Sequence, residues 1–239
     1  MRNQIIDNQD NQGYAQATLS KTFMSNVFSY MFVALAMSGI TAYVFGTSEN
    51  LINMLYNETG MSILGWIVML APLGLVFLMS AKFQKFSFLT LLGVFVLYSV
   101  LTGMSLGFIF MIYSIGSISI TFLVTAGTFG VMAILGYTTS TDLTKFGSIL
   151  RMAVIGLIIA MLVNMFMGSE TMDYVISGIG VLIFTGLTAY DTQKLKNIGA
   201  QIDANSEDGK KASIMGALSL YLDFLNLFLF LLRFMGGRD

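Results

Sequence analysis

Long apolar stretches alternate with short polar connections along the chain. Each stretch is close to the ~20 residues that an α-helix needs to cross ~30 Å of hydrocarbon. None shows the two-residue alternation of a membrane barrel strand, and each is about twice as long as such a strand, so helices are expected. The pattern predicts seven transmembrane helices, at residues 23–45, 61–81, 86–113, 118–137, 147–167, 174–191 and 213–235.

The composition agrees with a lipid-facing exterior. Of the 239 residues, 56% are hydrophobic and only 10% are charged, a balance that leaves a soluble domain of this length without enough polar surface. Residues 1–22 are polar, rich in Asn and Gln, and without the pattern of a signal peptide. We therefore expect an all-α integral membrane protein, with a flexible cytoplasmic tail at 1–22 and a single membrane domain at 23–239.

Two residue types that often carry chemistry are absent. The sequence contains no histidine and no cysteine, which excludes thiol nucleophiles, disulfides, histidine acid catalysis and the usual zinc sites. No run of basic residues indicates nucleic acid as a partner, and nothing in the sequence indicates a cofactor. Any chemistry must come from carboxylates, hydroxyls, amides or cations.

Basic residues mark one side of the predicted bundle. The connections after the second, fourth and sixth stretches contain Lys or Arg, whereas those after the first, third and fifth contain neither, and acids occur in the first and fifth. Because basic loops stay in the cytoplasm, the N-terminus is expected to be cytoplasmic. Seven full crossings place the C-terminus outside. The basic residues near the C-terminus are instead typical of the cytoplasmic side, so a shortened or re-entrant last helix is an alternative. The pattern rests on Arg2, Lys21, Lys82, Lys85, Lys145, Arg151, Lys194, Lys196, Lys210 and Lys211 inside, Glu49, Glu58, Glu170 and Asp173 outside, and Arg233 and Arg238 near the C-terminus.

Two aspartates stand within apolar sequence and are the main candidates for function. Asp191 ends the run Gly-Leu-Thr-Ala-Tyr-Asp at the cytoplasmic end of the sixth stretch, where it could also be merely solvated. Asp223 lies ten residues past Ser213, which is roughly 15 Å into the membrane at about 1.5 Å per residue. An ionisable group at that depth is a functional candidate by default.

A lone carboxyl at the depth of Asp223 would be neutral, because burial disfavours the charged form. Antiparallel packing of the sixth and seventh helices would bring Asp191 towards Asp223, and the two carboxyls would then share a proton and titrate as a pair. Such a pair is a pH-dependent switch and, when deprotonated, a site for a hard cation such as Ca²⁺. The alternative is a hydrogen bond between helices with no role in transport.

Three further polar residues are weaker candidates for lining the same interior path. Asn226 shares a helix face with Asp223, Asn164 lies deep in the fifth stretch, and Arg151 stands near the cytoplasmic start of that stretch. Hydrogen bonds between helices explain the amides equally well, and snorkelling towards water explains Arg151.

Three stretches together resemble the Bax inhibitor-1 family of transmembrane proteins, in particular its bacterial branch. The resemblance covers the whole chain in number of segments, and the last two stretches are specific as a pair. They are Gly136-Tyr-Thr-Thr-Ser-Thr-Asp-Leu-Thr with Gly147, then Phe184-Thr-Gly-Leu-Thr-Ala-Tyr-Asp-Thr-Gln-Lys, and Ala217-Leu-Ser-Leu-Tyr-Leu-Asp-Phe-Leu-Asn-Leu-Phe.

The resemblance implies a seven-helix bundle with the last helix central and a pH-sensitive Ca²⁺ leak across a membrane, here the inner membrane of a bacterium. By motif, the family's paired aspartates fall on Asp191 and Asp223, which implies a pH sensor and a cation site there. In the family an arginine at the inner end of the second helix holds the ionised pair. This sequence has Lys82 in that region, so Lys82 or Arg151 is the candidate to replace it, although a lysine lacks the bidentate fork.

Two other functions fit parts of the sequence. An intramembrane aspartyl protease also uses two aspartates, one of them after a tyrosine as in Tyr190-Asp191. It needs a Gly-x-Gly stretch before the second aspartate and a Pro-Ala-Leu segment, whereas Leu-Tyr-Leu precedes Asp223 and Pro72 is the single proline. The other alternative is a regulator that binds other membrane proteins without moving ions. A retinal protein is excluded, because no lysine falls inside a predicted crossing.

The charge pattern yields a test of topology. Single cysteines replacing Ser48 and Ser169 are expected to react with a membrane-impermeant thiol reagent added to intact cells, because their connections carry no Lys or Arg. A cysteine replacing Ser206, in the lysine-bearing connection before the last helix, is expected to react only after the cells are opened. The reverse labelling pattern would invert the orientation.

Overall fold

The chain folds into a bundle of long helices, described here from a computed structural model that covers residues 2–57 and 60–236, with side chains from 16 to 56 and from 60 to 236. Within this part of the chain, seven helices are long and apolar enough to cross a membrane, which confirms the predicted fold class. Glu58 and Arg238 of the charge pattern lie outside the described residues. The long helices are α1 (Arg2–Thr47), α3 (Ile63–Lys82), α4 (Phe88–Leu106), α6 (Ile115–Thr138), α7 (Thr144–Met167), α8 (Glu170–Gly199) and α9 (Glu207–Met235), and the short elements are α2 (Glu49–Leu55), β1 (Tyr56–Asn57), β2 (Gly60–Met61) and α5 (Ile109–Ile112).

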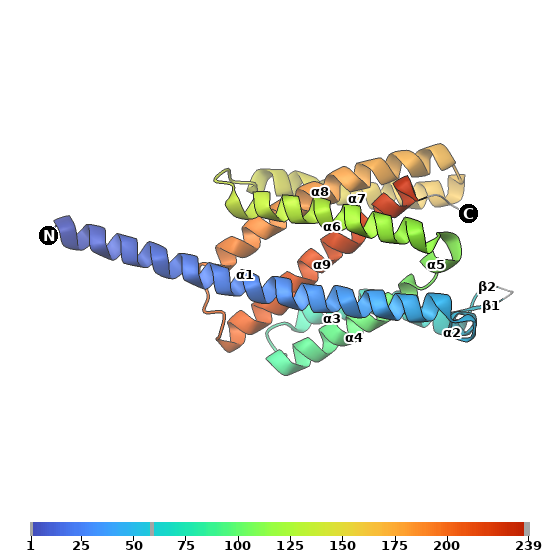
Figure 1. Cartoon of the computed structure of the whole chain (residues 1–239), viewed down its shortest axis with the longest axis horizontal. Helices are drawn as coiled ribbons and strands as arrows, with labels where there is room; N and C mark the ends of the chain where they lie inside the picture. Colours follow the sequence, from blue (N-terminus) through green and yellow to red (C-terminus); the bar gives the residue numbers. More distant parts are fainter. Residues whose placement is uncertain (1, 58–59, 237–239) are drawn as a thin grey trace.

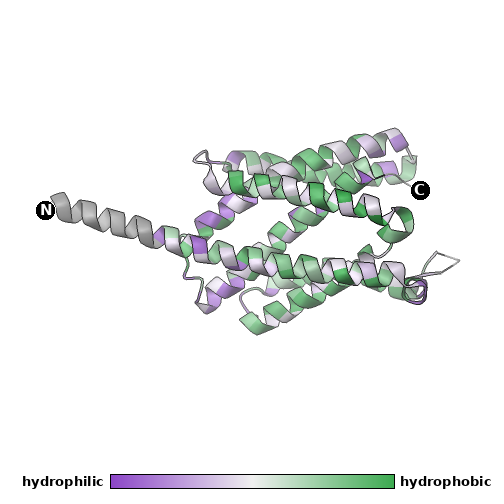
Figure 2. Cartoon of the chain, in the orientation of Figure 1, coloured by the Kyte–Doolittle hydropathy of each residue, from purple (hydrophilic) through white to green (hydrophobic). Residues whose placement is uncertain are grey.

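The connections fall at two ends of the bundle (Figure 1). One end, here called the lysine-rich end, holds the links α3–α4, α6–α7 and α8–α9, while α2, the paired strands β1 and β2, and α5 lie at the opposite end. Helix α9 runs unbroken over 29 residues to that opposite end, so it is long and apolar enough for a full crossing, which favours that interpretation over a re-entrant segment. Figure 2 shows polar colour gathered near the helix ends and apolar colour between them.

Helix α9 is the centre of the bundle. It packs against α8, α1, α6 and α4. In its most apolar stretch of 18 residues, 67% are buried, whereas the figure for the corresponding stretch of α7 is 17%. Tyr221, Leu220 and Leu227 of α9 are fully enclosed, whereas Phe166 of α7 is 85% exposed. The outer helices therefore present apolar side chains to lipid, and the prediction that the last helix is central is confirmed.

Two helices extend beyond the stretches that hydropathy marks. Helix α8 continues to Gly199, eight residues past Asp191, and α9 begins at Glu207 rather than at Ser213. A helix satisfies its own backbone hydrogen bonds in water as well as in lipid, so polar residues can prolong it where the apolar pattern stops. As a result Asp191 lies two turns inside α8 and not at its end. Helix α1 likewise reaches back to Arg2, and the predicted mobility of residues 1–22 stays a prediction.

Serine caps fix where several of the helices begin. The hydroxyl oxygen of the residue before the helix accepts a hydrogen bond from the backbone N–H three positions later, which satisfies one of the free amides of the first turn. This arrangement precedes α3, α4, α6, α8 and α9. The capping residues are Ser62, Ser87, Ser114, Ser169 and Ser206.

The opposite end of α8 and α9 is held by side chains. Asp173 of α8 pairs with Arg233 of α9, with 3.9 Å between carboxylate oxygen and guanidinium nitrogen. Beside this pair, the rings of Tyr174 and Phe234 have centroids 4.5 Å apart. Arg233 is a basic residue near a C-terminus that the charge pattern places outside. Its charge is thus compensated by an acid.

Close approach of α6 to α8 gives a test of the packing. A Cβ atom at Gly136 would lie 2.1 Å from the carbonyl oxygen of Ala189, and backbone cannot move aside as a flexible side chain can. We expect Gly136→Ala to destabilise the protein by roughly 1–3 kcal/mol, measured as a lower melting temperature in detergent. Gly127→Ala on the same helix is the control, because nothing lies within 4 Å of that position. Equal melting temperatures for the two variants would contradict this packing.

Candidate functional site

The interface between α8 and α9 contains both candidate aspartates. Asp191 belongs to α8, and its Oδ2 accepts a hydrogen bond of 2.7 Å from the hydroxyl of Ser219 on α9. Ser219 precedes Asp223 by one helical turn, so the two aspartates lie on facing parts of neighbouring helices. The carboxyl of Asp191 is within electrostatic reach of the carboxyl of Asp223. These two carboxyl groups are called the acid pair below.

Asp223 is buried more deeply than its partner. Its side chain is 5% exposed, and its Oδ2 has no hydrogen-bond partner among the described residues. Asp191 is only partly buried and reaches a cavity. A buried carboxylate without a donor is costly, because it has lost water and gained little in return. One oxygen of Asp223 is therefore an unsatisfied polar atom in an apolar interior.

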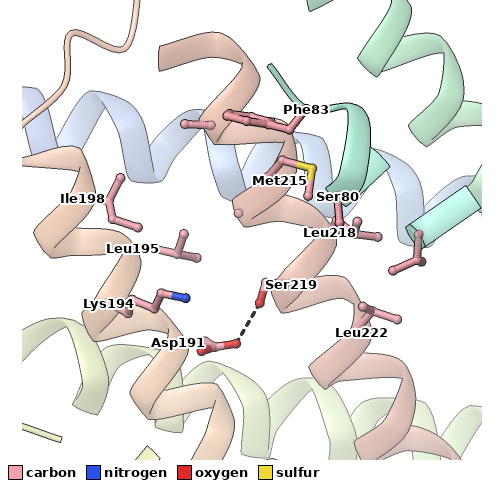
Figure 3. A pocket seen from close by; sticks show the side chains of 13 residues that line it. Ser80, Phe83, Asp191, Lys194, Leu195, Ile198, Met215, Leu218, Ser219 and Leu222 are labelled. Atoms are coloured by element: carbon pink, nitrogen blue, oxygen red, sulfur yellow. Dashed lines mark hydrogen bonds between the residues drawn. The ribbon is translucent and has the colours of Figure 1, made fainter. Parts of the chain in front are cut away.

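A cavity of about 490 Å³ lies between the end of α3, α8 and α9 and reaches Asp191. Asp191 and Ser219 lie at one end of it, and Phe83 and Met215 lie towards the other (Figure 3). Lys194, one turn after Asp191, also lines the cavity and directs its amine into it. The cavity thus joins an acid, a cation and a hydroxyl within one space.

Neither cation proposed from the sequence contacts the acid pair. Arg151 of α7 donates a hydrogen bond to the hydroxyl of Tyr190, and its guanidinium carbon lies 4.8 Å from the centre of that ring. Lys82 is the exposed last residue of α3 and does not line the cavity. Arg151 therefore contacts Tyr190, the residue before Asp191. Lys194 is the basic residue that lines the same cavity as Asp191.

The two candidate asparagines lie in different settings. Asn164 is at the end of α7, where its amide donates to Asp173 Oδ1 at 2.8 Å and to the carbonyl of Ser169 at 3.1 Å. Because Asp173 precedes Asp191 by about five turns of α8, this cluster is at the opposite end from the acid pair. Asn226 donates to the carbonyl of Leu222 in its own helix. The structure thus brings neither amide into contact with the acid pair.

The three stretches that carry the family resemblance form one packed unit. Gln193 of α8 accepts a hydrogen bond from the backbone N–H of Leu143 and donates one to the carbonyl of Thr141, at 2.9 and 2.7 Å. Gly147 leaves room for the ring of Tyr190, which a Cβ would meet at 2.3 Å. With the bond from Ser219 to Asp191, the α6–α7 connection, the end of α8 and the middle of α9 are joined around the acid pair.

Sequence reasoning missed Lys194, Ser219 and Gln193. A signal for the first two was present, because Lys194 is three residues after Asp191 and Ser219 is four before Asp223, and such spacings share a helix face. Gln193 had no such signal, since its partners are backbone groups some 50 positions away in the sequence.

The acid pair does not by itself make a full Ca²⁺ site. Ca²⁺ takes about 6–8 oxygen ligands, and within the described residues no three acids gather in one place. Any cation at the acid pair would complete its shell with hydroxyls, carbonyls or water.

These features define a polytopic α-helical membrane protein whose central helix carries a buried acid. The profile of the family described as "Inhibitor of apoptosis-promoting Bax1" matches residues 20–239. The chain therefore belongs to the Bax inhibitor-1 family.

Curated relatives from several bacteria agree with this assignment. Inner membrane protein YbhL of Escherichia coli is 46% identical over 219 residues, which cover 91% of this chain and 92% of the relative. A protein of Borreliella burgdorferi is 46% identical over 92% of this chain and 94% of its own length. A membrane protein of Streptococcus pyogenes is 34% identical over the full length of both chains. The relatives whose names are descriptive are named as membrane proteins, and this chain is a multi-pass membrane protein like them.

The brace formed by Gln193 can be tested by removal of its side chain. Gln193→Ala leaves the N–H of Leu143 and the carbonyl of Thr141 without their partner, so we expect a loss of roughly 1–3 kcal/mol of stability. Faster hydrogen exchange in residues 139–144, with a lower melting temperature, is the expected readout. Gln201→Ala, at an exposed position just beyond α8, is the control. If exchange in 139–144 is the same in both variants, the brace does not hold this connection.

Proposed function

We propose that this protein is a pH-sensitive Ca²⁺ leak channel or transporter that is gated by protonation of the acid pair. The observation that carries the proposal is the cavity that reaches Asp191, together with the buried carboxyl of Asp223 on the facing helix, one oxygen of which has no hydrogen-bond partner among the described residues. A cation that entered the cavity would meet two carboxyls in sequence. On α9, Asp223 is flanked by the buried apolar residues Leu220, Phe224 and Leu227, so this position is suited to a gate.

The proposed gate depends on the proton of the acid pair. One proton shared by the two carboxyls gives the lone oxygen of Asp223 a donor and leaves a smaller charge in the apolar interior. When both carboxyls are ionised, Asp191 attracts the ammonium of Lys194, which lines the same cavity. We infer that this attraction narrows the cavity at higher pH and that protonation releases it.

The ionic chemistry favours a hard divalent cation. Carboxylate, hydroxyl and carbonyl oxygens are the ligands that Ca²⁺ prefers, and Asp191, Asp223 and Ser219 supply the first two kinds. Conduction requires binding that is strong enough for entry and weak enough for exit. Two carboxyls on separate helices, with the rest of the shell from water, meet both needs.

The proposed setting is the inner membrane of a bacterium, with the lysine-rich end in the cytoplasm. The Escherichia coli relative is named as an inner membrane protein, and the basic connections favour this orientation. The cavity at the acid pair would then open towards the cytoplasm, and cytoplasmic acidification would act on it.

The main test is Ca²⁺ flux into liposomes that contain only the purified protein. The wild type is expected to pass more Ca²⁺ at pH 6 than at pH 8, because protonation releases Lys194. Asp223→Asn carries a fixed neutral amide, so its flux is expected not to vary with pH. Asp191→Asn and the double variant are expected to resemble it, because residues that act as a unit are not additive. Glu49→Gln, which removes an exposed acid at the opposite end, is expected to behave as the wild type.

A second pair of variants tests which lysine takes part in the gate. Lys194→Gln is expected to raise the flux at pH 8 towards that at pH 6, whereas Lys82→Gln is expected to leave both unchanged, since Lys82 does not line the cavity. Flux equal to that of empty liposomes at every pH would overturn the transport proposal and favour a regulator that binds other membrane proteins. Equal effects of the two lysine variants would remove Lys194 from the gate.

A further inference from the structure

A groove on the lipid-facing surface runs between α1 and α6, away from the acid pair. Three cavities of about 670, 620 and 530 Å³ lie along it. The first and second share Phe28 and Phe129, and the second and third share Leu35 and Phe224. Because neighbouring cavities have walls in common, they form one continuous groove, whose deeper wall is supplied by α9 through Phe224 and Phe228.

The groove is as long as the hydrocarbon layer is thick. Along α1 its lining begins at Lys21 and ends at Tyr43, which is about 33 Å at 1.5 Å per residue and close to the ~30 Å of a bilayer core. Its lining is mostly aliphatic and aromatic, so it is suited to acyl chains and not to the passage of headgroups.

Glycines keep the groove open. Gly39 of α1 and Gly130 of α6 both line it, and a Cβ atom built at either would meet nothing within 4 Å. Neither glycine is therefore needed for close packing of helices. The space beside them is available to something outside the chain.

Polar groups gather at one mouth of the groove. Lys21 is exposed and lines the groove at the lysine-rich end, together with Ser25, Tyr137 and Thr138. Within the described residues, Lys21 makes no ion pair with a carboxylate. A second ammonium, that of Lys196, is bound to the carbonyl of Tyr137 at 2.7 Å. The mouth thus offers positive charge and hydroxyls at the level where lipid phosphates lie.

We propose that this groove binds an anionic phospholipid of the leaflet at the lysine-rich end. The phosphate contacts Lys21 and the neighbouring hydroxyls, and an acyl chain lies along α1 and α6 past Gly130. Charge at one mouth, an apolar length behind it and open space at the glycines together select this occupant. The lipid would fill the gap between two helices that make few direct contacts and so brace the outer side of α9.

Native mass spectrometry of the full chain in detergent tests the proposal, with phosphatidylglycerol or phosphatidylcholine added at equal concentration. The wild type is expected to retain one phosphatidylglycerol in preference to phosphatidylcholine. Lys21→Gln is expected to reduce this preference by about fivefold, as the loss of one lysine near an anionic headgroup implies. Lys21 is exposed, so this variant separates binding from folding.

A second test fills the groove with a large side chain. Gly39→Phe and Gly130→Phe are expected to reduce retention of both lipids, while Gly156→Phe, at an open position on α7 that lines none of the three cavities, is expected to retain them as the wild type does. Circular dichroism and gel filtration establish that each variant is folded, and either groove variant suffices if the other fails to fold. Equal lipid retention in the groove variants and in Gly156→Phe would overturn the proposal. A lipid-free dimer in the wild type would overturn it in favour of a second copy as the occupant.

Discussion

Burial of a carboxyl in the central helix is the constraint on which the rest of the structure depends. Hydrocarbon offers no hydrogen bonds, so every polar group in the bundle interior must find a protein partner or stay neutral. Asp223 lies on the helix that is most enclosed, and one of its oxygens has no partner among the described residues. Asp191, which accepts a hydrogen bond from Ser219, and Lys194 in the adjoining cavity supply polar surroundings that an apolar helix alone would lack.

The fold followed from the sequence because hydropathy reports the environment of a helix directly. Stretches of about twenty apolar residues can be little else than membrane crossings, and the seven predicted crossings are present. Helix ends were less readable, since polar residues such as Gln193 and Lys196 continue α8 without an apolar signal. That extension matters, because it places Asp191 inside a helix and not at its end.

The candidate site was predicted in part. Both aspartates were visible, because acids are rare in apolar sequence. The basic residue beside them was missed although Lys194 shares a helix face with Asp191, because the charge pattern alone gave no reason to prefer it to Lys82 or Arg151. Only packing shows that Arg151 is engaged by Tyr190 and that Lys194 lines the cavity. Tertiary contacts of this kind have no period along the chain.

The pairing of Asp173 with Arg233, together with the rings of Tyr174 and Phe234, bears on how α8 and α9 can move. Two helices that are held together at one end separate most at the other end, far from the contacts that hold them. A change of charge at Asp191 and Asp223 would therefore displace the lysine-rich half of the interface more than the half that the Asp173–Arg233 pair holds. In the proposed channel, such one-sided movement would let an interior carboxyl exchange protons with one compartment while it stays sealed from the other.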